Sequence, residues 1–106
     1  MASLSEFQQL ELRVAVILEV KPHPNADRLY VLEIQVGEER KQIVAGIRLH
    51  YSPEELVGKK VVVVNNLEPA TIRGVESRGM ILAANDGSKL VLVTPDRDIA
   101  PGSQVR

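Results

Sequence analysis

The stretch that decides the fold covers residues 58–84 and reads GKKVVVVNNLEPATIRGVESRGMILAA. Two apolar runs within it, residues 61–64 and 80–84, predict two buried strands. The polar connection between these runs contains Pro69 and Gly74, residue types that favour turns. Two buried strands with a polar, mildly basic connection predict a rigid sheet that presents a binding surface. This stretch shows no catalytic arrangement of side chains.

Four more strands are predicted on either side of this stretch: residues 12–21, 29–36, 41–47 and 90–94. Pro22 ends the first of them, because proline cannot donate a hydrogen bond to a neighbouring strand. In the second, Leu32, Ile34 and Val36 alternate with polar residues, which is the pattern of a strand with one buried face. A glycine and two glutamates at residues 37–39 predict a hairpin turn into the third strand.

Two short helical turns are also predicted. Ser52 and Glu55 have the spacing of a capping box, which favours a helix start just before the fourth strand. Residues 5–10 predict one turn near the N-terminus, with Phe7 and Leu10 facing inward. The C-terminal tail is expected to be irregular because of three residues that interrupt strands: Pro95, Pro101 and Gly102.

These elements predict an all-β fold, because they amount to five or six short strands with a helical turn between the third and the fourth. That arrangement is typical of the OB-fold, a five-stranded Greek-key barrel that binds oligonucleotides on one sheet face and its adjoining loops. Another small barrel is also compatible with the strand pattern. The length of 106 residues predicts a single domain, with its core from about residue 7 to residue 105.

The residue types exclude several classes of function. The chain has no cysteine, and therefore no disulfide and no thiolate metal site. His23 and Asp27 are four residues apart, but the prolines beside His23 prevent the helix that would bring both side chains to one metal ion. Ser77 has no histidine near it in the sequence to act as a base. We therefore expect neither an enzyme nor a cofactor nor a metal.

The longest apolar runs, such as residues 14–18, are too short to span a membrane, and the N-terminus lacks the layout of a signal peptide. We therefore expect a cytoplasmic protein that has no membrane partner. Met1 and the full length of the domain favour a free-standing chain. Thirteen basic and fourteen acidic residues give a net charge of −1, so any affinity for nucleic acid must depend on local charge.

The central stretch carries a modest excess of positive charge, because its cations outnumber Glu68 and Glu76: Lys59, Lys60, Arg73 and Arg78. Ordinary solvated strand ends would also explain this excess. However, Arg28, Arg73 and Arg78 fall in predicted loops or strand edges near Asn and Ser, which contact sugar and phosphate oxygens. The chain has only three aromatic residues, whereas binders of unfolded strands stack bases on exposed rings. A nucleic-acid ligand would therefore be recognised by the shape of its folded backbone.

Segments along nearly the whole chain, from about Phe7 to Val105, carry a family resemblance: residues 12–14, 23–30, 44–47, 51–60, 66–67, 73–80, 82–84 and 94–96. The chain resembles the tRNA-binding OB-fold domain found at the C-terminus of many methionyl-tRNA synthetases. The same domain occurs in proteins like endothelial-monocyte-activating polypeptide and in stand-alone dimeric tRNA-binding proteins. The resemblance implies non-catalytic binding of folded tRNA with little sequence preference, a homodimer, and methionyl-tRNA synthetase as a partner.

The resemblance also assigns residues to the RNA surface. Ser77 and Met80 match the serine and methionine of the family's Ser-x-Gly-Met motif. Arg28 matches the basic residue after Ala-Asp, and Asn66 matches the asparagine of an Asn-Leu pair. From the residues alone, Ser77 could instead only shape the turn before Gly79, and Met80 could only fill the core. The predicted tRNA site is therefore Arg28, Asn66, Arg73, Ser77, Arg78 and Met80.

One departure from the family pattern bears on affinity. Family members often carry a basic cluster around the proline, where this chain has Glu68, Ala70 and Thr71. Because contacts to phosphate supply much of the affinity for nucleic acid, fewer cations predict weaker tRNA binding and a smaller dependence on salt. A second hypothesis follows from this departure, namely a homodimerisation or protein-interaction module in which tRNA binding is weak or lost.

Overall fold

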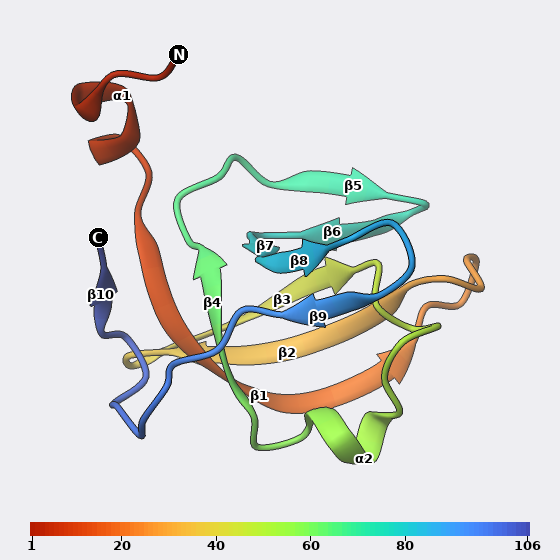
Figure 1. The fold of residues 1–106 in the computed structure, drawn as a ribbon. Helices are drawn as coiled ribbons and strands as arrows, with labels where there is room; N and C mark the ends of the chain where they lie inside the picture. The colour runs from red at the N-terminus through yellow and green to blue at the C-terminus, as the bar shows by residue number, and fades with distance from the viewer.

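The computed structural model describes residues 1–106, and its main sheet is antiparallel with the strand order β3-β2-β1-β4-β7. The strands of this sheet are β1 (Leu12–Pro22), β2 (Tyr30–Val36), β3 (Glu39–Ala45), β4 (Lys60–Val64) and β7 (Met80–Ile81). The sheet curls so that β3 approaches β6 (Val75–Ser77), and the Arg78 N–H donates a hydrogen bond to the Gln42 carbonyl at 3.0 Å (Figure 1). The result is a half-barrel of the OB type, and the predicted fold class is confirmed.

The core lies on the concave side of the curled sheet. Every second residue of each long strand points there, so the fully buried side chains include Ile17 of β1, Leu32 and Ile34 of β2, and Val61 and Val63 of β4. Burial of one such side chain contributes roughly 1.5–3 kcal/mol. The predicted alternation of the second strand is therefore confirmed, and it is this alternation that fixes which face of the sheet turns inward.

The helix α2 (Pro53–Leu56) lies between β3 and β4, where the sequence predicts it. The predicted capping box is present, because the Ser52 N–H donates to Glu55 Oε2 at 2.7 Å. Leu56 is fully buried against the barrel. One turn of helix therefore closes one end of the barrel with a single apolar side chain.

The connection between β4 and β7 is more regular than predicted. It contains a hairpin of β5 (Ala70–Ile72) and β6, in which Ile72 pairs with Val75 across a two-residue turn. Both turn residues have a positive φ, 52° at Arg73 and 89° at Gly74, as in a type I′ turn. The predicted strand over residues 80–84 is divided into β7 and β8 (Ala83–Asn85), and β8 pairs with β9 (Leu90–Leu92).

The C-terminal tail, which the sequence predicts to be irregular, ends in a short strand. Its last residues form β10 (Gln104–Val105), which pairs with the start of β1. The tail reaches β1 through two backbone hydrogen bonds, from Gly102 N–H to the Val14 carbonyl at 2.7 Å and from Val14 N–H to the Ser103 carbonyl at 2.9 Å. Gly102 passes so close to the β2–β3 turn that a Cβ on it would lie 2.7 Å from the Cα of Gly37.

The N-terminal helix α1 (Leu4–Gln8) stands away from the barrel on an extended segment (Figure 1). Its N-terminus is capped by Ser3 and Glu6, but none of its residues is buried. Phe7 is 41% exposed and Leu10 is 45% exposed, so the prediction that both side chains face inward is wrong. Phe7 and Leu10 have the spacing of one helix face, but this face packs against no core within the chain.

Candidate nucleic-acid interface

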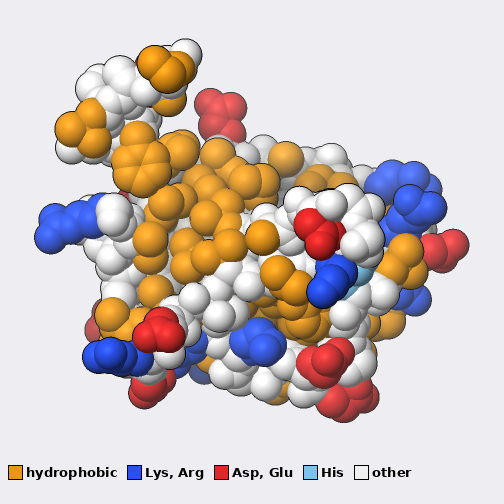
Figure 2. Space-filling view, viewed as in Figure 1, with side chains coloured by type: hydrophobic (Ala, Val, Ile, Leu, Met, Phe, Trp, Pro, Cys, Tyr) orange, Lys and Arg blue, Asp and Glu red, His pale blue; other side chains and the backbone are white.

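Two segments far apart in the sequence meet at one end of the barrel, the β1–β2 loop and the turn of the β5–β6 hairpin (Figure 1). Together they line a shallow cleft of about 420 Å³, formed by Asn25, Ala26, Asp27, Arg28, Leu29 and Arg73. We refer to it as the arginine cleft. Figure 2 shows Lys and Arg side chains gathered over this end of the molecule, on the right of the view. The structure therefore brings the predicted residues Arg28 and Arg73 together.

The arginine cleft is held by reciprocal hydrogen bonds between the two segments. The Arg73 guanidinium donates from Nη2 to the Asn25 carbonyl at 3.0 Å. In return, Asn25 Nδ2 donates to the Arg73 carbonyl at 3.3 Å. Arg48, just beyond β3, supports the loop from below by donating from Nη1 to the Ala26 carbonyl at 3.2 Å. The roles of Asn25 and Arg48 could not be predicted from the sequence. Their partners, Arg73 and Ala26, lie 48 and 22 residues away along the chain.

The charge of the cleft suits an anion. Arg28 forms no ion pair and its side chain is exposed, while the other cations nearby are Arg73 and Arg48. Asp27 is the only carboxylate that lines the cleft. Guanidinium groups present several N–H donors in a fixed plane, which matches the oxygens of a phosphate. The arrangement can bind phosphate groups, and it has no group placed for acid–base or nucleophilic chemistry.

Ser77 lies in the interior, and the residue is only 3% exposed. Its Oγ accepts a hydrogen bond from the Val44 N–H at 2.9 Å and donates one to the Gly79 carbonyl at 3.0 Å. The hydroxyl therefore ties β6 to β3 and shapes the turn before Gly79. Arg78 is exposed beside it, at the opposite end of β6 from Arg73.

Met80 and Asn66 lie in other surroundings. Met80 pairs with Val64, and both side chains are on the outer face of the sheet, opposite to the core. Asn66 donates from Nδ2 to the Gln9 carbonyl at 2.7 Å and accepts from the Glu11 N–H at 2.8 Å. Its amide thus holds the junction between α1 and β1. Of the six predicted residues, the structure brings only Arg28 and Arg73 to one cleft.

The same junction contains a small polar network that the sequence did not reveal. Glu11 accepts from Asn65 Nδ2 at 3.0 Å and pairs with Arg13 Nε at 3.2 Å. The hydrogen bond from Asn65, followed by that from Arg13, lowers the pKa of Glu11 from its ordinary 4.5. Lys41 donates to the Asn65 carbonyl at 2.9 Å, and burial lowers the pKa of its ammonium group. The network joins the start of β1 to the end of β4 and to β3.

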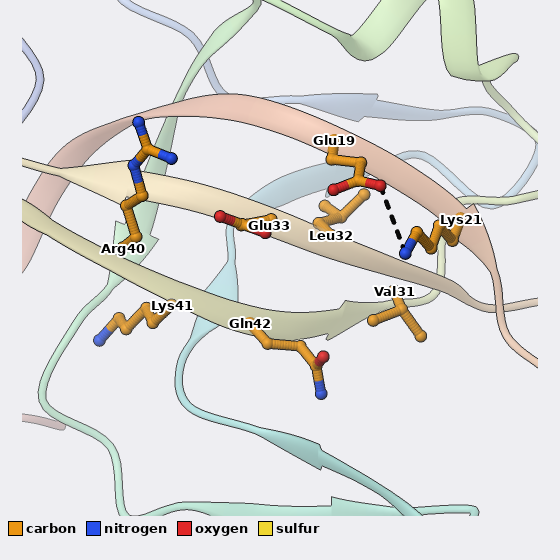
Figure 3. A pocket seen from close by; sticks show the side chains of 8 residues that line it. All are labelled: Glu19, Lys21, Val31, Leu32, Glu33, Arg40, Lys41 and Gln42. Atoms are coloured by element: carbon orange, nitrogen blue, oxygen red, sulfur yellow. Dashed lines mark ion pairs between the residues drawn. The ribbon is translucent and has the colours of Figure 1, made fainter.

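A second pocket, of about 260 Å³, lies on the outer face of β1, β2 and β3 (Figure 3). Acidic and basic side chains alternate around it, and Lys21 pairs with Glu19 at 3.3 Å. Glu33 and Arg40 lie on the neighbouring strands. Because its carboxylates oppose phosphate, this pocket is a poorer site for a nucleic-acid backbone than the arginine cleft.

The structure contains neither a cluster of metal ligands nor a membrane-spanning helix. No three or more His, Asp or Glu side chains come together in a way that could hold a metal ion. Neither helix has the length and apolar character that crossing a membrane requires.

The outer side of the sheet carries an apolar surface that we call the apolar face. It consists of a buried cluster of Leu12, Val62 and Val64 with Leu82 and Val105 packed against it, together with the exposed Met80 and Val93. Val93 adjoins the cluster because its N–H donates to the Leu82 carbonyl at 3.1 Å. Figure 2 shows hydrophobic side chains extending from the foot of α1 across this side of the molecule.

The OB half-barrel is an architecture that binds oligonucleotides on one sheet face and its adjoining loops, and in this chain two loops form the arginine cleft. The chain belongs to the tRNA-binding domain family, since the family model described as "Putative tRNA binding domain" matches residues 12–104. It is 52% identical over 104 residues to methionine–tRNA ligase of Thermococcus kodakarensis. That alignment covers 98% of this chain but 14% of the ligase, so the chain spans about one seventh of the length of such relatives.

Solved structures agree with this assignment over the full length of the chain. A MetRS-related protein from Pyrococcus horikoshii is 31% identical, with a TM-score of 0.92 and coverage of 100% of this chain and 98% of that one. The chaperone CsaA from Bacillus anthracis is 30% identical, with a TM-score of 0.91 and coverage of 100% and 99%. The fold and the family resemblance inferred from the sequence are therefore confirmed.

Proposed function

We propose that this chain is a non-catalytic module that binds folded tRNA by shape, with Arg28 and Arg73 as direct contacts to backbone phosphates. The arginine cleft carries this proposal, because it places two guanidinium groups from separate loops on one surface. Phosphate contacts position a protein on nucleic acid without reading its sequence. The small number of aromatic residues supports recognition of a folded backbone over stacking on bases.

The test compares labelled tRNA with an unstructured RNA of equal length, each titrated with the protein at low and moderate salt. We expect tighter binding of tRNA, with affinity that falls as salt rises. The double variant Arg28→Gln, Arg73→Gln should bind more weakly and reduce the salt slope by about 2. Equal binding of both RNAs, or no effect of the double variant, would contradict the proposal.

Arg97→Gln is the matched control for this experiment. It removes one positive charge from a different cleft, which Arg97 lines together with Lys59 and Lys60 and which shares no residue with the arginine cleft. Arg97 is fully solvated, with a side chain that is 91% exposed and an Asp96 carboxylate 3.6 Å away. Arg28→Gln alone removes one charge as well, and a loss of tRNA affinity in Arg97→Gln equal to that in Arg28→Gln would indicate that only net charge matters.

The residues at the usually basic positions support weak binding. Glu68, Ala70 and Thr71 are all exposed, so the outer edge of the β5–β6 hairpin presents a carboxylate and no cation. We propose that Ala70→Lys with Thr71→Lys strengthens tRNA binding and steepens the salt slope by about 2. Unchanged binding would mean that bound tRNA does not pass along this edge.

We propose that Asn66 and Ser77 act by positioning and that Arg78 extends the phosphate contacts along β6. The amide of Asn66 and the hydroxyl of Ser77 already have protein partners, which supports this division. Met80 has none, but its side chain is beside Val64 on the apolar face. We therefore propose that Met80, as part of the apolar face, contacts the molecule that covers this face, which is either tRNA or a second protomer.

The second function that the structure favours is homodimerisation. The helix α1 buries none of its residues although Leu4 and Phe7 are apolar, Leu10 just after it is also exposed, and the apolar face lies next to its foot (Figure 2). We propose that two copies cover these surfaces mutually, which would remove from water the apolar side chains that a single copy leaves exposed. Sedimentation equilibrium at micromolar concentration should give twice the chain mass. A monomer at all concentrations would refute the dimer without affecting the tRNA proposal.

We also propose that the module works joined to, or in association with, a methionyl-tRNA synthetase. The support is the similarity to one seventh of several methionine–tRNA ligases. A tethered tRNA-binding module raises the local concentration of tRNA near an active site. Addition of the protein to a synthetase assay at limiting tRNA should increase the charging rate, and Arg73→Gln should reduce the increase.

A further inference from the structure

His23 is buried in the β1–β2 loop, at 3% exposure, between two prolines. The N–H of Asn25 donates to its Nδ1 at 2.9 Å. A backbone N–H can only donate, so Nδ1 is the unprotonated nitrogen of a neutral ring and the proton is on Nε2. Nε2 is 2.9 Å from the Ile72 carbonyl and therefore donates to it.

Ile72 comes immediately before Arg73, so the His23 bond connects the β1–β2 loop to the residue that leads into the hairpin turn. The bond spans 49 residues of sequence. Together with the two Asn25–Arg73 hydrogen bonds, it makes three contacts between the loop and the hairpin. Of the three, the His23 bond is partly buried, whereas the two Asn25–Arg73 bonds are exposed.

Hydrogen bonds to β3 hold the hairpin at its Ser77 end, and the turn end depends on the contacts with the β1–β2 loop. Its strands are three residues long, and Ala70 and Thr71 of β5 are exposed. A two-stranded hairpin of this size is marginal in water without packing against another element. If the loop–hairpin contacts were absent, the turn end would be less restricted, the distance between Arg73 and Arg28 would vary more, and binding would have to restrict it.

We infer that His23 is a positioning residue for RNA recognition, which sets the separation of Arg28 and Arg73 so that both reach phosphates of one folded backbone. This inference rests on the tRNA-binding function proposed above. It assigns the ring of His23 the role of joining the two halves of the arginine cleft. The ring itself does not contact RNA, because it is buried under the loop.

Two substitutions separate the two nitrogens of the ring. In His23→Gln, the side-chain amide can still donate to the Ile72 carbonyl, but the acceptor for Asn25 N–H is lost. In His23→Asn, the shorter side chain can still accept from Asn25 N–H, but the bond to the hairpin is lost. We expect His23→Asn to weaken tRNA binding about three- to tenfold, the effect of one lost hydrogen bond, and His23→Gln to retain most of the affinity.

The role also predicts non-additivity. If His23 acts through Arg73, then His23→Asn should weaken binding much less in an Arg73→Gln background than in the wild type. Three results would each overturn the inference. They are wild-type affinity in His23→Asn, equal losses of affinity in His23→Asn and His23→Gln, and full additivity of His23→Asn with Arg73→Gln.

A measurement without RNA keeps the inference separate from the proposed function. Amide hydrogen exchange of β5 and β6 should be faster in His23→Asn than in His23→Gln, while the amides of β1 and β2 stay equally protected in both. If the wild type binds no tRNA at low salt, the proposed function fails, and exchange still decides whether His23 holds the hairpin. Unchanged exchange in His23→Asn would overturn the inference even if tRNA binds.

Discussion

Gly102→Ala should destabilise the protein through the close approach of the tail to the β2–β3 turn. The new Cβ would lie 2.7 Å from the Cα and 2.8 Å from the N of Gly37, and backbone atoms cannot move aside as a side chain can. The positive φ of 95° adds a cost of about 1 kcal/mol for a residue with a Cβ. If the tail detaches, its two backbone hydrogen bonds with Val14 are lost as well, at about 1 kcal/mol each.

Gly87→Ala is the matched control, because Gly87 has the same φ of 95° but no atom within 4 Å of its Cβ position. The difference between the two variants isolates the close approach from the backbone conformation. We expect Gly102→Ala to be less stable than Gly87→Ala by about 2 kcal/mol, which lowers Tm by roughly 10 °C more in a domain of this size. Thermal unfolding followed by circular dichroism measures both.

Equal melting temperatures for the two variants would refute the reasoning, since the tail would then have moved without cost. The same variant reports on the apolar face, because Val105 of β10 packs against its cluster. A displaced tail should therefore weaken the proposed dimer in Gly102→Ala and leave it intact in Gly87→Ala. Sedimentation of both proteins at one concentration makes the comparison.

Three further predictions concern other parts of the molecule. Phe7→Asp should produce a monomer in sedimentation with an unchanged circular dichroism spectrum, because Phe7 contributes nothing to the core of its own chain. Ser77→Ala should lower the free energy of unfolding by about 1–3 kcal/mol, because the buried Val44 N–H loses its acceptor, and should weaken tRNA binding less than Arg73→Gln. The lowered pKa of Glu11 means that its bonds stabilise the fold above pH 4.5 and are lost as pH falls through the lower folded value. Glu11→Gln should therefore reduce the fall in stability with acid, measured by urea unfolding at several pH values below 5.

The long strands could be predicted from the sequence because each carries enough alternating residues to show its period. The β5–β6 hairpin could not, since three residues per strand show no period and Arg73 stands where Asn or Gly would indicate a type I′ turn. The inward direction of Phe7 failed for a different reason. A helical spacing of apolar residues identifies a face that avoids water, but it does not identify which molecule the face packs against.

Two of the six residues that line the arginine cleft could be predicted from the sequence. Arg28 and Arg73 were predicted because each lies in a polar loop, and the barrel brings these loops together. The partners of Asn66 and His23 could not be predicted, because they lie 55 and 49 residues away along the chain. Short polar side chains can form such bonds almost anywhere, so only the folded geometry reveals them.

Under the proposed function, the conformation of Arg73 places stability in competition with RNA binding. It is the only residue other than glycine with a positive φ, 52°, and an arginine there costs about 1 kcal/mol that glycine would not. A library randomised at this position and sorted for heat resistance alone should therefore enrich Gly and Asn. The same library sorted for RNA binding should return arginine or lysine, so thermostable descendants of this chain would lose ligand affinity first at its hairpin turn.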